Sequence, residues 1–255
     1  MKVFEEYARY YDLLYRDKDY ASEAQFVHQL IQKHAPGARS ILELGCGSGA
    51  HAQCLAKLGY RIHGVDVSTE MLESAEKRRT GMDQEQSSRI TFSQGNIHNI
   101  SLGQHFDAVI ALFHVMSYQT SNSDLKDTFA TAKHHLDKAG VFIFDYWYGP
   151  AVLTDRPTVR VKRKADEVIS VVRLAEPVMS ANNNLVQVNY QVFITDKAKS
   201  TIHTFQESHH MRYLFKPELD WFLAEAGFQH VEFGEWLTAR DPGYPTWSVY
   251  SVGRT

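Results

Sequence analysis

The sequence has little of several features that mark specialised classes of protein. Its 255 residues include two cysteines, Cys46 and Cys54, which are too few for a disulfide scaffold and lack the spacing of a zinc site. No apolar run is long enough to span a membrane, and residues 1–6 carry acids instead of the apolar core of a signal peptide. We therefore expect free thiols, no bound metal, no membrane attachment and a cytoplasmic location.

Positive charge is also scarce in continuous runs. The formal net charge is -3, and the two basic runs, residues 76–79 and 162–164, are short. The first lies at an expected helix end, where lysine and arginine interact favourably with the helix dipole. Neither run is typical of nucleic-acid binding. The hydrophobic share of 44% and the charged share of 22% are close to globular averages, so we expect one main domain with a sizeable core.

Residues 41–51 predict a buried strand, a glycine loop and the start of a helix. Gly45, Gly47 and Gly49 occupy alternate positions, and glycine permits positive φ angles and a close approach of the backbone to a ligand. Apolar residues at helical spacing follow from Ala50. We expect a small molecule to lie across this loop.

The remainder of the first 149 residues alternates strands with helices, a pattern that predicts a parallel sheet. The continuous apolar run in 106–114 is typical of a strand that is buried on both faces. The expected strands after the loop are 61–67, 90–97, 106–114 and 141–145, and the expected helices are 22–33, 69–79 and 124–135.

From about residue 150 to 215 the helical pattern is replaced by period-two alternation, which predicts antiparallel hairpins. A helix beginning at Pro217 and two final strands then return to the main sheet. We therefore predict a core of residues 1–149 and 216–255 and an inserted antiparallel β lobe of residues 150–215. The lobe is expected to roof the ligand site or to form a homodimer surface. The expected lobe strands are 159–164, 168–174, 185–194 and 202–215.

The glycine loop alone is compatible with two cofactors of opposite charge. Gly45, Gly47 and Ala50 satisfy a dinucleotide-binding pattern, and Asp66 lies near the distance expected for a ribose-binding acid. Glu43, however, would place a negative charge beside a pyrophosphate, which is unfavourable in a partly dry site. The same carboxylate would attract a cofactor that carries a sulfonium and an ammonium group.

The glycine loop with Glu43, together with residues 65–66, 94–97 and 106–109, strongly resembles class I S-adenosylmethionine-dependent methyltransferases in order and spacing. The resemblance implies an α/β fold with a Rossmann-like, seven-stranded, mostly parallel sheet, the antiparallel insertion lying between strand five and the last helix. It also implies S-adenosylmethionine as cofactor, with its methionine end at the loop, its ribose at Asp66 and its adenine near Met71 and Asn96. The implied cofactor-binding residues are Tyr11, Glu43, Gly45, Cys46, Gly47, Asp66, Val67, Met71, Gly95, Asn96, Ile97 and Leu112.

The resemblance extends to the subgroup that N-methylates amino sugars linked to nucleotides. It is carried by residues 10–20, 144–148 and 209–215. The chain departs from the subgroup's dimethyltransferases at Tyr118, where they place a histidine, and near Val3, where they use a tyrosine. The resemblance therefore implies a methyltransferase that acts on a small polar acceptor, most plausibly an amino group of a nucleotide-linked sugar. A methyltransferase of another metabolite, an NAD-dependent oxidoreductase and a non-catalytic cofactor-binding protein are the alternatives.

Three candidate catalytic residues, His114, Tyr118 and Asp145, follow expected strands four and five, at the sheet edge where open α/β sheets bind ligands. One of them is expected to act as general base, although His114 contacting adenine and Asp145 capping the next turn are the alternatives. Neighbouring residues of a strand point to opposite faces, so at most one of His209 and His210 can reach a ligand. The residues predicted to contact substrate are Tyr7, Trp147, His210 and Arg212.

Overall fold

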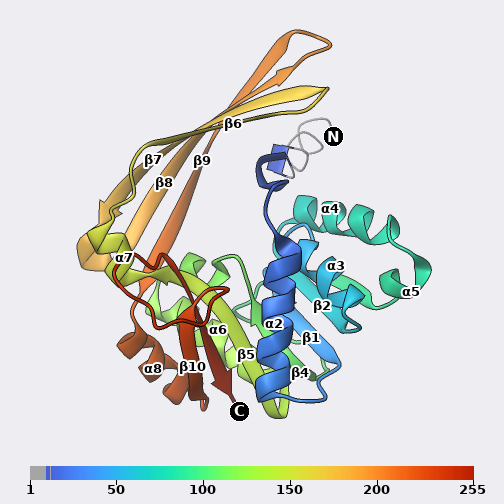
Figure 1. Cartoon of the computed structure of the whole chain (residues 1–255), viewed down its shortest axis with the longest axis vertical. Helices are drawn as coiled ribbons and strands as arrows, with labels where there is room; N and C mark the ends of the chain where they lie inside the picture. The colour runs from blue at the N-terminus through green and yellow to red at the C-terminus, as the bar shows by residue number, and fades with distance from the viewer. Residues whose placement is uncertain (1–9, 12) are drawn as a thin grey trace.

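The computed structural model describes residues 10, 11 and 13–255. Its centre is a sheet in which the first five strands are parallel, in the order β3-β2-β1-β4-β5, and are followed by β11 and β10, each antiparallel to its neighbour (Figure 1). This arrangement confirms the predicted fold class. The core strands are β1 (Ser40–Leu44), β2 (Arg61–Asp66), β3 (Ile90–Gln94), β4 (Phe106–Ala111), β5 (Leu136–Tyr148), β10 (Gln229–Glu235) and β11 (Ser248–Arg254).

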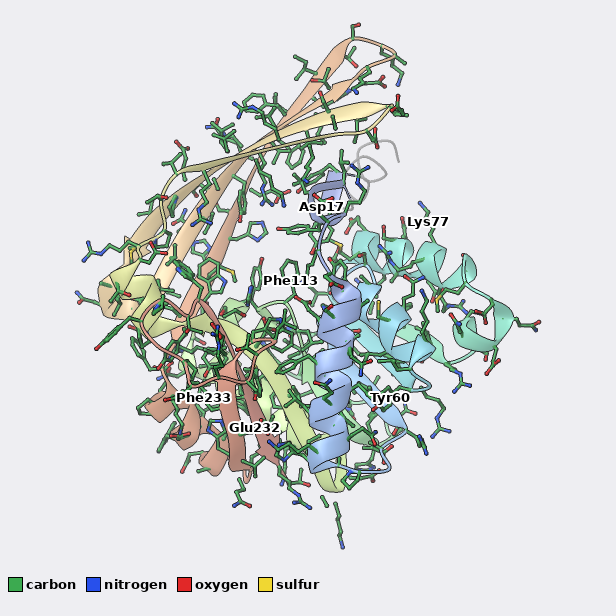
Figure 2. All side chains as sticks on the ribbon, viewed as in Figure 1. Asp17, Tyr60, Lys77, Phe113, Glu232 and Phe233 are labelled. Atoms are coloured by element: carbon green, nitrogen blue, oxygen red, sulfur yellow. The ribbon has the colours of Figure 1, made fainter. Side chains whose placement is uncertain are left out.

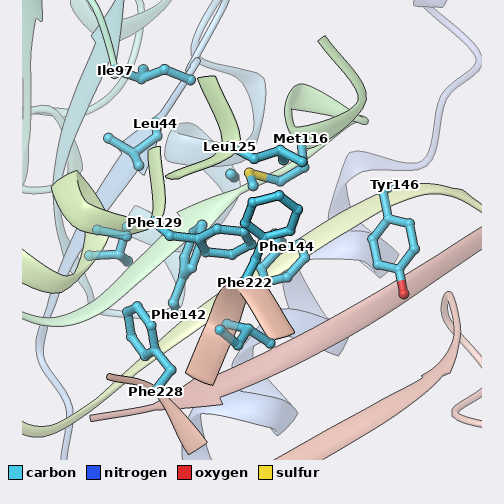
Figure 3. Packing of buried hydrophobic residues seen from close by; sticks show 14 of the residues in the cluster. Leu44, Ile97, Met116, Leu125, Phe129, Phe142, Phe144, Tyr146, Phe222 and Phe228 are labelled. Carbon is cyan, nitrogen blue, oxygen red and sulfur yellow. The ribbon is translucent and has the colours of Figure 1, made fainter. Parts of the chain in front are cut away.

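Helices cover both faces of this sheet. On one face α2 and α3 pack over β1, β4 and β5, and α2 is seen lengthwise across the front of the molecule in Figure 1. On the other face α6 and α8 enclose an aromatic cluster in which Phe129 packs against Phe142 and Phe144 (Figure 3). The helices are α2 (Tyr20–His34), α3 (Ala50–Lys57), α4 (Thr69–Thr80), α5 (Gln84–Ser87), α6 (Asn122–His134), α7 (Gly149–Thr154) and α8 (Lys216–Glu225).

The inserted strands form a tall antiparallel sheet that rises away from the core (Figure 1). Its strand pairing with the core is at the end of β5, where Trp147 and Tyr148 pair with Tyr213 and Leu214 of β9. Within the described residues the two parts make one sheet of 11 strands, four more than the predicted core sheet. The inserted strands are β6 (Arg160–Ala165), β7 (Ile169–Ser180), β8 (Leu185–Asp196) and β9 (Thr201–Leu214).

The segment before α2 lies under this tall sheet. Tyr10, Leu13 and Leu14 are buried against apolar side chains of β7 and β8, and Asp17 forms an ion pair with Lys164 of β6. Figure 2 shows Asp17 just below the inserted sheet and Phe113 between this segment and the core. The segment therefore closes one side of the space between the two parts of the molecule. In the part of the chain that the structure describes, no helix is both long and apolar enough to cross a membrane.

Candidate active site

A cavity of about 560 Å³ lies between the carboxyl ends of the parallel strands and the inserted sheet. Its walls combine the glycine loop, the ends of β2 and β4, the segment before α2 and three inserted strands. The lining residues are Tyr10, Tyr11, Tyr15, Tyr20, Gly45, Cys46, Gly47, Ser48, Ala50, His51, Asp66, Val67, Met71, Asn96, Ile97, His98, Leu112, Phe113, His114, Val115, Tyr118, Gln119, Trp147, Arg173, Tyr190, Glu207, His209 and Met211.

The glycine loop adopts the conformation that its sequence requires. Gly45 and Gly47 have φ angles of 72° and 52°, a region that residues with a Cβ atom rarely adopt. A Cβ atom on Gly45 would also lie 2.6 Å from Val115, whereas one on Gly47 would meet no atom within 4 Å. The Gly47 N–H donates a hydrogen bond of 2.8 Å to Asp66. The loop therefore presents its backbone to the cavity, and Asp66 fixes its position.

Glu43 lies at the end of β1 behind the loop and is buried. Its Oε2 atom has no hydrogen-bond partner among the described residues, and its Oε1 atom lies 3.7 Å from Nδ1 of His51. Burial, together with the negative charge of Asp66, raises the pKa of Glu43 to about 8. A buried carboxyl group that lacks a partner is costly, and a positively charged ligand would remove that cost. This end of the cavity therefore favours a cation.

The opposite side of the loop offers an apolar surface. Val67, with 61% of its surface exposed, lines the cavity beside Met71, Ile97 and Leu112. Asn96 also lines the cavity, and its side-chain oxygen accepts a hydrogen bond from the backbone of His98. Such a surface suits a flat aromatic group such as adenine.

The structure brings most of the predicted cofactor residues together. Tyr11 lines the cavity, and so does every predicted cofactor residue between Gly45 and Leu112 except Gly95. A Cβ atom on Gly95 would lie 2.3 Å from Ile100. Glu43 stands behind the loop and not in the wall. The absence of a side chain at Gly95 therefore makes room for core packing.

The chain turns sharply after β4, in a way that the sequence did not indicate. Phe113 and His114 have φ angles of 64° and 66°, and a short 3-10 helix, η1 (Val115–Tyr118), follows. Positive φ at non-glycine residues costs about 1–3 kcal/mol each. Buried Asp145 offsets part of this cost, because its carboxylate accepts the His114 N–H at 3.0 Å. Asp145 thus supports the turn from behind and does not line the cavity.

The turn places His114 and Tyr118 in the cavity wall. Nδ1 of His114 lies 2.8 Å from the Asp145 carboxylate and forms no hydrogen bond within the described part of the chain. The Tyr118 hydroxyl, in contrast, is hydrogen-bonded to Nδ1 of His209 at 2.8 Å. The two side chains therefore occupy the same wall with different surroundings.

Two predicted substrate residues lie elsewhere. His210 is exposed on the outer face of β9, and its neighbour His209 faces the cavity. Arg212 is buried and donates a hydrogen bond to the side chain of Asn122, and its guanidinium group lies 3.7 Å from the Glu218 carboxylate. Arg212 therefore fastens β9 to α6 and α8. Neither predicted residue lines either cavity, because the twist and register of β9 set the direction of both side chains. Trp147 lines the cavity, whereas Tyr7 and Val3 lie outside the described residues.

The sequence analysis missed Arg173, Tyr190 and Glu207, three polar residues of the inserted sheet that reach the cavity. Arg173 lies over the ring of Tyr190, 4.5 Å from its centroid. Hydrogen bonds from Tyr10 and His209 hold Glu207. The spacing of Glu207 and His209, two positions apart on one strand, was a usable signal, since such residues share a face.

A second cavity of about 510 Å³ lies beyond the first, and His114, Trp147, Arg173 and Tyr190 line both. Its outer part combines aromatic and basic groups. Trp247 stands edge-on to Trp147, with ring centroids 5.7 Å apart. Arg160, Lys162 and Arg173 supply three positive side chains. Among the described residues, no group of three or more histidine, cysteine or acidic side chains is placed to hold a metal ion.

Comparison with known proteins shows consistent relationships. Residues 41–140 match the methyltransferase domain family. A dTDP-3-amino-3,4,6-trideoxy-alpha-D-glucopyranose N,N-dimethyltransferase of Streptomyces venezuelae is 29% identical over 90% of this chain and 92% of its own length. The crystal structure of DesVI from Streptomyces venezuelae superposes with a TM-score of 0.80, at 25% identity over 97% of each chain. An S-adenosylmethionine-dependent methyltransferase of Clostridium acetobutylicum has the same fold, with a TM-score of 0.82 at 22% identity, covering 99% of this chain and 98% of that one.

The sheet order, the glycine loop and the acid at the end of β2 define a class I methyltransferase. The chain is an S-adenosylmethionine-dependent methyltransferase, and the predictions of family, enzyme class and cofactor are confirmed. The site also fits this cofactor physically. The unpartnered oxygen of buried Glu43 suits its positively charged methionine end, and the open space beside Gly47 leaves room for the backbone to cradle it.

Proposed function

We propose that this methyltransferase transfers a methyl group to the amino group of a nucleotide-linked sugar. The observation that carries the proposal is the pair of cavities that share one wall. The first cavity contains the cofactor residues, and the second holds three basic side chains next to tryptophan rings. An acceptor that spans both would place its nucleotide in the second cavity and its amine at the shared wall.

The charge of the second cavity supports an anionic acceptor. Burial and the positive charges of Arg173 and Lys164 lower the pKa of Lys162, so these cations repel one another in the structure. A diphosphate would relieve this repulsion, and arginine forms two parallel hydrogen bonds with phosphate oxygens. The names of the amino-sugar methyltransferases to which the chain is similar support the same class of acceptor.

When bound, S-adenosylmethionine supplies a methyl group that is already activated by a positively charged sulfur. The residues of the chain therefore need to align the amine with it and exclude water. Tyr11, Tyr15 and Tyr20 close the cavity from the side of α2 and provide the exclusion of water. His114 and Tyr118 face the shared space, and one of them takes up the proton that the amine loses.

The test is a transfer assay with isotopically labelled S-adenosylmethionine and a panel of acceptors. The panel contains nucleotide-linked amino sugars, the same amino sugars without the nucleotide, and nucleotide-linked sugars with a hydroxyl in place of the amine. We expect label in the first group only. Equal labelling of the free amino sugars would contradict a role for the second cavity, and labelling of the hydroxyl compounds would contradict amine specificity.

We also propose that two copies pair through the inserted sheet and that the protein works in the cytoplasm. Exposed valines on and beside β6 and β7, including Val159, Val161 and Val178, support the pairing, because exposed apolar surface favours association. The division into a core of 1–149 and 216–255 and a lobe of 150–215 belongs to the same proposal. Light scattering of the purified chain at several concentrations would show a dimer, and a monomer at all of them would contradict it.

A further inference from the structure

A continuous chain of hydrogen bonds crosses the first cavity from the core to the inserted sheet. The Tyr118 hydroxyl meets Nδ1 of His209 at 2.8 Å, and Nε2 of the same ring meets Oε2 of Glu207 at 3.0 Å. The other oxygen of Glu207 accepts the Tyr10 hydroxyl at 2.7 Å. We propose that Tyr118, His209 and Glu207 form a proton relay that removes the proton released when the acceptor amine is methylated. This inference rests on the proposed function.

The carboxylate fixes the direction of every hydrogen in the chain. Burial raises the pKa of Glu207, but hydrogen bonds from His209 and Tyr10 outweigh burial and leave that pKa below its ordinary value, so Glu207 is ionised. An ionised carboxylate only accepts hydrogen bonds, so Nε2 of His209 carries a hydrogen and Nδ1 of the neutral ring accepts one. The hydroxyl hydrogen of Tyr118 therefore points at His209. Its hydroxyl oxygen also has acceptor lone pairs, and Tyr118 lines the cavity with 46% of the residue exposed.

His114 lacks such a chain. Its Nδ1 atom is close to Asp145 without a hydrogen bond, and the Asp145 carboxylate is already engaged by the His114 backbone N–H. This carboxylate therefore stabilises the strained turn through the backbone N–H. Of the two side chains that face the shared space, Tyr118 is the one with a path along which a proton can leave.

Methylation of the acceptor amine releases one proton to this relay. The nitrogen lone pair forms the new N–C bond, the electron pair of the C–S bond stays on sulfur, and the nitrogen becomes positively charged. One N–H proton passes to the oxygen of Tyr118, whose own hydroxyl proton passes to Nδ1 of His209. The amine is then neutral, and the imidazolium lies against ionised Glu207. His209, with 28% of its side chain exposed, returns the proton to water.

The first measurement needs neither cofactor nor acceptor. Long-range ¹H–¹⁵N correlation spectra of the full chain report which nitrogen of a neutral histidine carries the hydrogen, and a His209→Gln variant assigns the signal. We expect the hydrogen on Nε2 in the unaltered protein. We also expect the Nδ1 resonance to move toward that of a nitrogen without a hydrogen bond in Tyr118→Phe. A hydrogen on Nδ1 would overturn the relay.

The second measurement is steady-state kinetics with the amine acceptor. General-base assistance is typically worth about 10²–10⁴ in rate, so Tyr118→Phe should lower kcat about 100-fold and leave KM within about threefold. Glu207→Gln should lower kcat about tenfold, because the amide keeps the shape and loses the charge. His203→Gln, at an exposed position of the same strand, is the matched control and should leave kcat unchanged.

The variants are first shown to be folded by titration with S-adenosylhomocysteine, which should bind each of them as it binds the unaltered protein. A kcat for Tyr118→Phe within about twofold of the original would overturn the relay. Failure of the unaltered protein to methylate any amine would overturn the proposed function and the relay's role with it. Normal amine methylation with the hydrogen on Nδ1 of His209 would overturn the relay alone.

Discussion

The two halves of the first cavity are built in different ways. The cofactor half, residues 45–51, 66–71 and 96–97 with Glu43 behind them, combines the backbone of the glycine loop with nearby side chains. It is held by contacts that are near in sequence, such as that of Gly47 with Asp66, 19 positions apart. The acceptor half comprises Tyr118, Trp147, Arg173, Tyr190, Glu207 and His209. Its contacts are between side chains and span 91 positions from Tyr118 to His209 and 197 from Tyr10 to Glu207.

This difference explains how such an enzyme can keep one cofactor and change its acceptor. A backbone cradle depends on φ angles and on a few glycines, so most side-chain changes leave it intact. A wall of side chains from distant strands changes shape with single substitutions. Variants in the cofactor half should therefore affect binding of every substrate, and variants in the acceptor half should affect selected acceptors.

The largest effect is expected from Asp66→Ala in the cofactor half. The carboxylate accepts the backbone N–H groups of Gly47 and Ser68 at 2.8 and 2.9 Å, and hydrogen bonds to charged groups contribute about 1.5–3 kcal/mol. Its loss should raise the Kd for S-adenosylhomocysteine at least ~100-fold in isothermal titration. Asp127→Ala, on the exposed side of α6, is the control. A Kd within ~threefold of the original for Asp66→Ala would contradict the assigned role.

A second effect tests the charge of the cofactor half. Burial and Asp66 raise the pKa of Glu43 to about 8, and an ammonium group binds the ionised form. Affinity for S-adenosylhomocysteine should therefore fall as the pH is lowered from about 8 to about 6, by at most about tenfold per unit, because a single proton is taken up. Glu43→Gln should remove this dependence. An equal decline in both proteins would show that another group is responsible.

A smaller and more selective effect is expected in the acceptor half. Arg173→Ala removes one of the three cations of the second cavity and should raise KM for a nucleotide-linked amino sugar about tenfold, leaving the Kd of S-adenosylhomocysteine within about threefold. Arg163→Ala is the matched control, because Arg163 is exposed and lines neither cavity. Equal changes in the KM of the acceptor and the Kd of S-adenosylhomocysteine would contradict the division of the cavity into a cofactor half and an acceptor half.

The cofactor half of the site could be predicted from the sequence, whereas the turn that carries part of the acceptor half could not. The strand ending at Leu44, the alternate glycines and Asp66 are local signals, and the structure forms the loop that they predict. The four inserted strands were also expected, because period-two alternation needs only neighbouring residues. The left-handed turn at Phe113 and His114 was not, since it depends on a hydrogen bond to Asp145, 31 positions away.

The sequence by itself determined the fold class and the cofactor half, because backbone conformation and strand order follow from residue types at short range. Only the tertiary structure decided that His209 and not His210 faces the cavity, that Arg212 fastens β9 to the core, and that Arg173 joins two cavities. In the described part of the chain the inserted sheet pairs with β5 at two register positions, and its twist then sets the direction of each side chain. The twist of a strand accumulates over a dozen residues, so no local sequence pattern indicates the final direction of a side chain.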